Sequence, residues 1–121
     1  MHLDATGTRA PEISFDTFLK VDIRVGTIRA VQPFPEARKP SLKLEIDFGP
    51  TIGMKHSAAQ IAGRYTPEQL VGRQVAAVVN FPPRQIGKFM SEVLVLGFPS
   101  ADGQVVLLAP DQAVPDGGRL F

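Results

Sequence analysis

The side chains that could perform acid–base or nucleophilic catalysis are few and poorly placed in this sequence. There is no cysteine, and the two histidines are His2, near the N-terminus, and His56. Ser57 follows His56 directly, but neighbours on a strand point to opposite faces, so they cannot act as nucleophile and base. Histidine and cysteine are too scarce for a typical metal site, and Ile86-Gly87-Lys88 lacks the rest of a phosphate-binding loop. We therefore expect a protein without a catalytic centre, metal or cofactor.

Basic, polar and aromatic side chains instead gather in three stretches that suit a binding surface. They are Arg38-Lys39-Pro40 with Lys43, then Lys55, His56, Ser57 and Gln60, and finally residues 80–90. A cation beside an aromatic ring suits a stacked base and an apolar peptide side chain equally. Core packing is the alternative for Phe81 and Phe89. Tryptophan is absent and there is one tyrosine, which weakens the case for single-stranded nucleic acid.

The charge is unevenly distributed along the chain. The net charge is only +1, but residues 38–88 hold eight basic and three acidic side chains. This basic central segment favours an anionic or polar partner, and a scattered solvated surface is the alternative.

These side chains must be positioned by short strands, because apolar residues alternate with polar ones over several stretches. Strands are predicted over residues 21–25, 42–48, 51–56, 75–79, 92–97 and 104–108. The 42–48 stretch alternates most clearly, and the 75–79 stretch is apolar on both faces, as in a central strand. Gly26 predicts a bulge or sharp bend, and Asp102-Gly103 predicts a hairpin turn.

Helices and loops complete the pattern. Ser14 as N-cap and the spacing of Phe15, Phe18 and Leu19 predict a short helix over residues 14–20. Residues 58–64 are predicted to be helical, and Thr66-Pro67 begins another helical turn. Prolines make residues 32–40 a loop and end the strand before Pro82-Pro83. The order predicts an all-β fold, a five-stranded oligonucleotide/oligosaccharide-binding (OB) barrel. It has a helix between strands 3 and 4, a short N-terminal helix and terminal extensions; a β-sandwich is the alternative.

The chain length of 121 residues predicts one domain. Residues 1–12 lack periodicity and are expected to form a flexible leader, with the OB domain over residues 13–121. The N-terminus does not resemble a signal peptide, and the longest apolar run, residues 75–79, is far too short to span a bilayer. We expect a soluble protein without membrane insertion, and the lack of cysteine fits the cytoplasm.

Several stretches resemble a known family. Residues 18–26, continued by residues 37–49 and 80–96, resemble the tRNA-binding OB domain of bacterial methionyl-tRNA synthetases and free-standing tRNA-binding proteins. Within that family the stretches 78–86 and 91–97, with Pro110-Asp111 and Val114-Pro115, are most similar to the CsaA-type export chaperones. The tRNA-binding relatives typically carry Asn-Leu-Lys-Pro at Asn80-Phe81-Pro82-Pro83, and Ser-Glu-Gly-Met where this chain has residues 91–94. Loss of that lysine shifts the surface away from phosphate contact.

The resemblance implies a function and a set of site residues. It implies an ATP-independent secretion chaperone, not an enzyme, that binds unfolded preproteins or peptides in the OB-fold groove. Binding of tRNA or single-stranded RNA is the alternative, and a structural dimer module acting on a larger partner is a third possibility. The groove residues implied by position are Lys39, Lys55, His56, Ser57, Gln60, Asn80, Phe81, Arg84, Lys88 and Ser91. A homodimer is also implied, with Phe15, Phe18 and the tail from Pro110 to Val114 as interface candidates.

Overall fold

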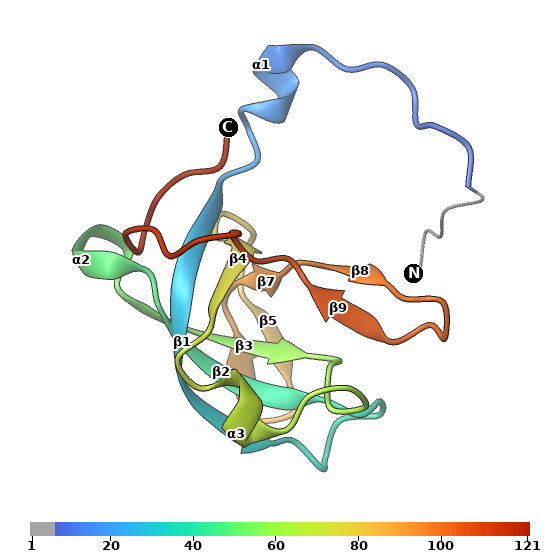
Figure 1. Cartoon of the computed structure of the whole chain (residues 1–121), viewed down its shortest axis with the longest axis vertical. Coiled ribbons are helices and arrows are strands. Elements are labelled where there is room, and N and C mark those ends of the chain that lie inside the picture. The colour runs from blue at the N-terminus through green and yellow to red at the C-terminus, as the bar shows by residue number, and fades with distance from the viewer. Residues whose placement is uncertain (1–6) are drawn as a thin grey trace.

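The computed structural model describes residues 7–121 and is dominated by a curled antiparallel sheet (Figure 1). Five strands form this sheet in the order β3-β2-β1-β4-β7. They are β1 (Ile23–Pro33), β2 (Leu42–Asp47), β3 (Met54–Ala59), β4 (Gln74–Val78) and β7 (Leu94–Val95). The two edge strands approach each other, and Glu92 N donates to His56 O at 2.8 Å beside them. The sheet is therefore a nearly closed barrel, which confirms the predicted OB architecture over the sandwich.

The long strand β1 belongs to both halves of the barrel. Its first half, from Ile23 to Thr27, pairs with β4, and its second half, from Thr27 to Pro33, pairs with β2. The expected loop therefore begins after Pro33 and not at Gln32. The register shifts between Ile28 and Ala30, so the irregularity lies at Arg29 and the prediction of a bulge at Gly26 is wrong.

Gly26 has a different purpose in the barrel. A Cβ atom there would lie 2.7 Å from both Ile46 Cγ2 and Phe48 Cδ1, which is inside van der Waals contact. The absence of a side chain lets these two core residues pack directly on the β1 backbone.

The core fills the barrel from the alternating face of β2. Leu42, Leu44 and Ile46 point inward, as the sequence pattern predicts, and Phe48 follows them into the interior. The residues packed around them come from the other strands, from α3 and from the segments between elements. They are Ile28, Ile61, Leu70, Val75, Ala77, Val93 and Leu107. Burial of this apolar surface is the main stabilising contribution.

The helices are single turns. In α1 (Phe15–Phe18) the Ser14 hydroxyl accepts a hydrogen bond from Thr17 N at 3.1 Å, so the predicted N-cap is present. The helix between β3 and β4 is α3 (Pro67–Leu70), which begins at a proline as expected. An unexpected turn, α2 (Gly49–Ile52), begins at Gly49 and is followed by Gly53, and both glycines have a positive φ.

Two sequence predictions in this region are wrong. The third strand starts at Met54, because residues 49–53 are used in the α2 turn, and not at Thr51. The helix expected over residues 58–64 does not form. Residues 58–59 continue β3, because pairing with β2 outweighs their helical pattern, and residues 62–64 form a turn.

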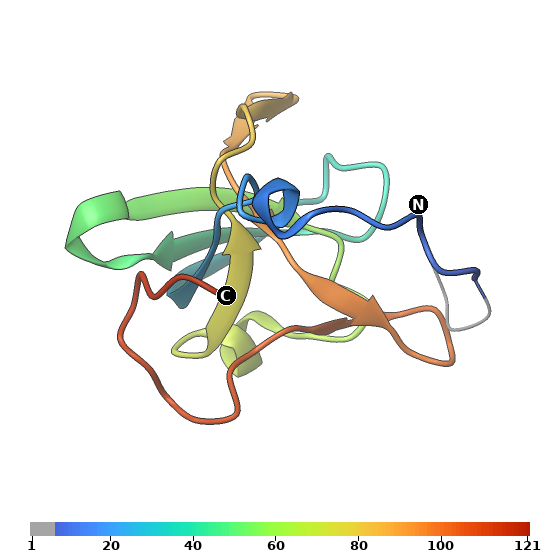
Figure 2. The same ribbon diagram turned by 90° about the horizontal axis from the view of Figure 1, so that it is seen from above.

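Two hairpins extend from the barrel. Residues 80–90, predicted to be one loop, contain β5 (Arg84–Ile86) and lead into β6 (Phe89–Ser91), with Gly87 at positive φ in the turn. The second hairpin joins β8 (Gly97–Pro99) to β9 (Val105–Leu107), with the predicted Asp102-Gly103 turn. The predicted 92–97 strand is divided between β7 and β8. Figure 2 shows the β5–β6 hairpin projecting from the barrel on its own, away from the β8–β9 hairpin.

The C-terminal tail, residues 110–121, returns to β1 and is fastened there. Val25 exchanges backbone hydrogen bonds with Gly117 and Gly118, and Leu120 N donates to Ile23 O at 2.8 Å. Residues 7–12 are exposed and carry no regular secondary structure, while residues 1–6 of the expected leader, including His2, lie outside the described residues. Within residues 7–121, no helix has the length and apolar character needed to cross a membrane.

Candidate functional site

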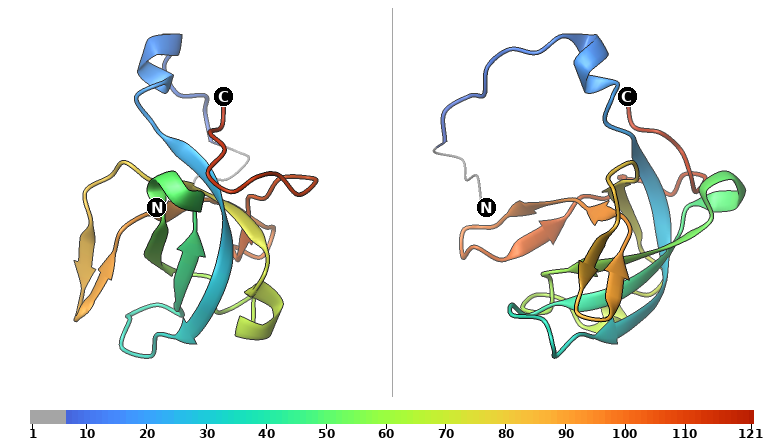
Figure 3. Two further views of the ribbon diagram at one scale, coloured as in Figure 1. Left: turned by 90° about the vertical axis from the view of Figure 1, so that its left-hand side faces the viewer. Right: turned by 180° about the vertical axis from the view of Figure 1, so that it is seen from behind.

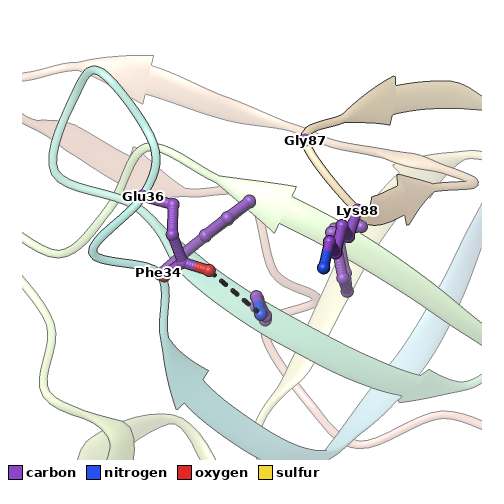
Figure 4. Close-up of a pocket in the computed structure, with 6 residues that line it drawn as sticks. Phe34, Glu36, Gly87 and Lys88 are labelled. Atoms are coloured by element: carbon purple, nitrogen blue, oxygen red, sulfur yellow. Dashed lines mark ion pairs between the residues drawn. The ribbon is translucent and has the colours of Figure 1, made fainter.

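A pocket opens on the outer surface of the barrel between the loop that follows β1 and the turn of the β5–β6 hairpin (Figure 4). Its volume is about 440 Å³. The residues that line it are Phe34, Glu36, Lys43, Gly87, Lys88 and Phe89. Figure 3 shows the hairpin standing beside β3, so the outward faces of β2 and β3 continue this surface. We call it the hairpin pocket.

Two aromatic rings form the apolar side of the hairpin pocket. Phe34 is only 4% exposed, and its backbone is held in the loop by hydrogen bonds to Ser41 O and from Ala37 N. Phe89 begins β6 and pairs with Ile86 across the hairpin. The two rings meet edge to face, with centroids 5.5 Å apart. Aromatic pairs prefer this arrangement.

Lys43 supplies the central cation of the hairpin pocket. Its side chain leaves the outward face of β2, because Leu42 and Leu44 on either side point into the core. The Lys43 Nζ atom lies 4.7 Å from the Phe34 ring centroid and 5.5 Å from that of Phe89. Glu36 Oε2 is 4.0 Å away from the same atom. The pocket thus combines an apolar wall with a partly buried positive charge.

A polar network borders the pocket along β3. The His56 ring meets Phe89 edge-on, with centroids 6.1 Å apart. Glu92 Oε1 accepts hydrogen bonds from His56 N at 2.9 Å and His56 Nδ1 at 3.1 Å, and Lys55 Nζ lies 3.8 Å from Glu92 Oε2. Burial raises the pKa of Glu92, but the His56 hydrogen bonds and the Lys55 charge outweigh it, so the net pKa lies below its usual value.

This network does not form a nucleophile–base arrangement. Ser57, beside His56, points into the core with 1% exposure, and its hydroxyl donates to Val93 O at 2.9 Å. The described residues contain no group of three histidine, cysteine or acidic side chains that could hold a metal ion. The chemistry available at this surface is binding through apolar contact and charge.

The structure brings part of the expected groove together. Lys88 lines the hairpin pocket, and His56 contacts Phe89. Lys55 pairs with Glu92 beside it, and the Ser91 hydroxyl accepts from Ala58 N at 3.0 Å where β6 meets β3. Arg84 pairs with Ser91 across the hairpin and is exposed.

Other expected groove residues are placed at its edge or away from it. Lys39 is exposed in the loop that carries Phe34 and Glu36, Gln60 is exposed just after β3, and Phe81 is exposed before β5. The Ser57 side chain is not brought to the surface. The Asn80 side chain accepts from Asp22 N at 3.0 Å and donates to Lys20 O at 2.7 Å, so it fastens the segment between α1 and β1.

Some residues of this surface were not assigned from the sequence. Lys43 and Phe89 lie in the stretches singled out above but were not among the assigned groove residues. Phe34 and Glu36 were missed, although an aromatic residue between two prolines in a polar loop is a signal that could have found Phe34. Glu92 had no local signal, because its partner His56 is 36 residues away.

A second, apolar cavity of about 360 Å³ lies between β1, the end of β9 and the C-terminal tail. Pro110 and Val114 line it together with Ile23, Val25 and Leu120. Phe15 is 67% exposed on α1, and its ring lies 6.2 Å from that of Phe18. Two of the expected interface residues therefore share one cavity, and the other two share the small N-terminal helix.

Comparisons with known proteins agree on one family. The family model described as "Putative tRNA binding domain" matches residues 23–119. The crystal structure of the chaperone CsaA from Bacillus anthracis is 51% identical, covers 92% of this chain and 100% of its own, and has a TM-score of 0.84. The CsaA chaperone from Picrophilus torridus is 50% identical, with coverage of 91% and 100% and the same TM-score.

Curated relatives include much longer proteins. A methionine–tRNA ligase of Porphyromonas gingivalis is 39% identical over 111 residues, which is 92% of this chain and 16% of the ligase. The chain therefore spans about a sixth of the length of the curated relatives it matches.

Proposed function

The chain belongs to the tRNA-binding domain family, and from this premise we propose that it is an ATP-independent, non-enzymatic chaperone that holds unfolded polypeptides. The clients are preproteins or peptides in the cytoplasm, kept in an extended state before export. They bind in the hairpin pocket and along the neighbouring strands. The similarity to two proteins named CsaA chaperone, each about half identical to this chain and covered over the whole of its own length, supports this assignment.

The observation that carries the proposal is the pairing of Lys43 with the Phe34 and Phe89 rings. An apolar peptide side chain that enters the pocket removes its surface from water, which contributes roughly 25 cal/mol per Å² buried. A pocket of about 440 Å³ accepts one large side chain without demanding a particular shape. Binding of this kind is weak and tolerant of sequence, as a carrier of unfolded chains requires.

The free edge of β5 offers a second means of holding an extended chain. Among the described residues β5 pairs only with β6, so its other edge presents backbone groups without a strand partner. An extended polypeptide can add a strand to such an edge, and main-chain hydrogen bonds then supply affinity that does not depend on sequence.

Binding of tRNA or single-stranded RNA is the second candidate, favoured by the family model and by the similarity to methionine–tRNA ligases. Lys88 and the exposed Arg84 on the same hairpin supply cations for phosphate. The aromatic side chains argue for peptide, because Phe34 is buried and Lys43 lies over the rings, which leaves little flat ring surface for a stacked base.

Two copies of the chain form the working unit in this proposal. Phe15 and Val114 are exposed apolar residues on the N- and C-terminal segments, and the cavity beside Val114 is lined mainly by apolar residues. Exposed apolar surface of this kind is typical of an interface.

A salt series on one preparation tests the two candidate ligands. Binding of an unfolded preprotein and of tRNA is measured at low and moderate salt, for the wild type and for Arg84→Ala. Phosphate contacts release counterions, so RNA affinity falls steeply with salt whereas peptide affinity hardly changes. Arg84→Ala is expected to reduce RNA binding sharply and peptide binding slightly.

The control is Arg64→Ala, which removes the same charge beside Asp102 in the β8–β9 turn, away from the hairpin pocket. Peptide binding that is absent at every salt concentration overturns the chaperone proposal. RNA retention that is absent at low salt removes the second candidate.

A further inference from the structure

The charge on Lys43 is unusually well placed to select a ligand group. Its side chain is 27% exposed, and the Phe34 and Phe89 rings cover part of the ammonium. Within residues 7–121 it forms one ion pair, with Glu36. A cation that has lost part of its water is stabilised by ring faces and still favours an anion at its open side.

The Glu36 carboxylate is a poor permanent partner for this cation. The Glu36 side chain is 66% exposed and belongs to a loop, and its oxygen is 4.0 Å from Lys43 Nζ, at the long end of the range for an ion pair. Such pairs contribute little to stability in water. The dashed line in Figure 4 marks this ion pair between Glu36 and Lys43. An incoming carboxylate with better geometry can therefore replace it at small cost.

The side of the pocket opposite Glu36 also favours a negatively charged ligand. Lys88 lies across the pocket from Glu36, in the turn of the β5–β6 hairpin. Lys88 forms no ion pair within the described part of the chain. Once Glu36 moves aside, the pocket holds two cations next to an apolar wall, and the anion that fits it must be joined to an apolar group.

From this arrangement we propose that the hairpin pocket selects a carboxylate adjoining an apolar side chain of the bound polypeptide, and that Glu36 occupies the place of that carboxylate in the free protein. The inference rests on the proposed peptide-binding function and specifies its ligand class. The carboxylate comes from an acidic side chain or from the C-terminus of a peptide. Glu36 then acts as a built-in competitor that lowers the affinity for peptides with such a group, because their carboxylate must displace it from Lys43.

The test uses three labelled peptides that share one apolar core sequence. The first peptide ends in a phenylalanine with a free C-terminal carboxylate. The second has the same sequence with an amidated C-terminus. The third is also amidated but carries an internal glutamate beside the phenylalanine. Fluorescence anisotropy gives the dissociation constant of each peptide for the wild type, Lys43→Gln and Glu36→Gln. Glu68→Gln, an exposed acidic residue in α3, is the matched charge control.

We expect the wild type to bind a carboxylate peptide about fivefold more tightly than the amidated one, the factor for an ion pair of about 1 kcal/mol. Lys43→Gln brings these affinities together. Glu36→Gln tightens binding of carboxylate peptides about threefold by removing the competitor, whereas Glu68→Gln leaves all three affinities unchanged. The first and third peptides show which source of carboxylate is used.

The outcomes separate this inference from the function on which it rests. Equal wild-type affinity for all three peptides overturns carboxylate selection and leaves peptide binding intact. Failure to bind any of the peptides overturns the proposed function itself. If Lys43→Gln and Glu36→Gln change the affinity for a tRNA probe but not the differences among the peptides, the pocket serves RNA and the inference is wrong.

Discussion

The Glu92 carboxylate holds His56 at two points, because Oε1 accepts hydrogen bonds from the backbone amide at 2.9 Å and from ring Nδ1 at 3.1 Å. The backbones of the two residues are also joined directly, since Glu92 N donates a hydrogen bond to His56 O at 2.8 Å. These bonds lie where β3 approaches β6 and β7, outside the regular ladders of the sheet. One acidic side chain therefore helps to close the barrel next to the hairpin pocket.

Closure by Glu92 predicts a dependence of stability on pH. The pKa of this carboxyl is lower in the folded protein than its usual value of 4.5, so its ionised form stabilises the fold above that pH. This contribution is lost as the pH falls through the lower folded pKa. We expect Glu92→Gln to reduce the free energy of unfolding by about 1 kcal/mol at pH 7. Urea denaturation should show the difference shrinking below pH 4.5.

The control for this pH series is Glu68→Gln, in which an exposed carboxylate of α3 is neutralised. Asp22 also has a lowered pKa, because Arg24 donates a hydrogen bond to it, so the whole protein loses stability in acid. The difference between Glu92→Gln and wild type isolates one group. A difference that stays constant from pH 7 to pH 3 would falsify the assigned role of Glu92.

Ser57 is expected to act on stability and not on ligand binding. Its buried hydroxyl donates to Val93 O across the closure of the barrel. Ser57→Ala leaves that carbonyl without its partner, at a cost of about 1–3 kcal/mol. Thermal denaturation measures the loss, and peptide affinity measured well below the melting temperature should stay at the wild-type value. Weaker peptide binding with unchanged stability would contradict this prediction and support a role of Ser57 in the groove, as the sequence resemblance implies.

Gly26 is predicted to be intolerant of any side chain. In Gly26→Ala the new methyl group meets Ile46 and Phe48 at 2.7 Å, and both residues are fully buried and unable to retreat. Overpacking of this kind costs about 1–3 kcal/mol. In the matched variant Gly118→Ala the nearest atoms are 3.5 Å away or more, so its denaturation midpoint should lie close to that of wild type. Equal midpoints for the two variants would contradict this close packing around Gly26.

The sequence predicted those features of the fold that depend on neighbouring residues. The alternation from Leu42 to Phe48 identifies the inner face of β2, and Ser14 marks the start of α1. Asp102-Gly103 identifies the second hairpin for the same reason, because a tight turn is decided by the residues within it.

The features that were predicted wrongly or not at all depend on contacts between distant segments. Residues 58–59 follow a helical pattern, but pairing with β2 keeps them in β3. The β5–β6 hairpin was not predicted, because Pro82-Pro83 directly before it is typical of a loop. The pocket itself depends on contact between Phe34 and Phe89, which are 55 residues apart in the sequence. No local sequence pattern predicts a contact between residues so far apart.

The proposed homodimer yields the last prediction. Phe15 is two-thirds exposed on α1, and its helix is held by the Ser14 cap and not by burial of this ring. Phe15→Glu should therefore leave the monomer folded while placing a charge in the proposed interface, where an unpaired buried charge is strongly unfavourable. Light scattering is expected to show the mass falling from two chains to one. Val71→Glu, at an exposed position after α3, should keep the wild-type mass. If Phe15→Glu also keeps it, the N-terminal helix does not join the two copies.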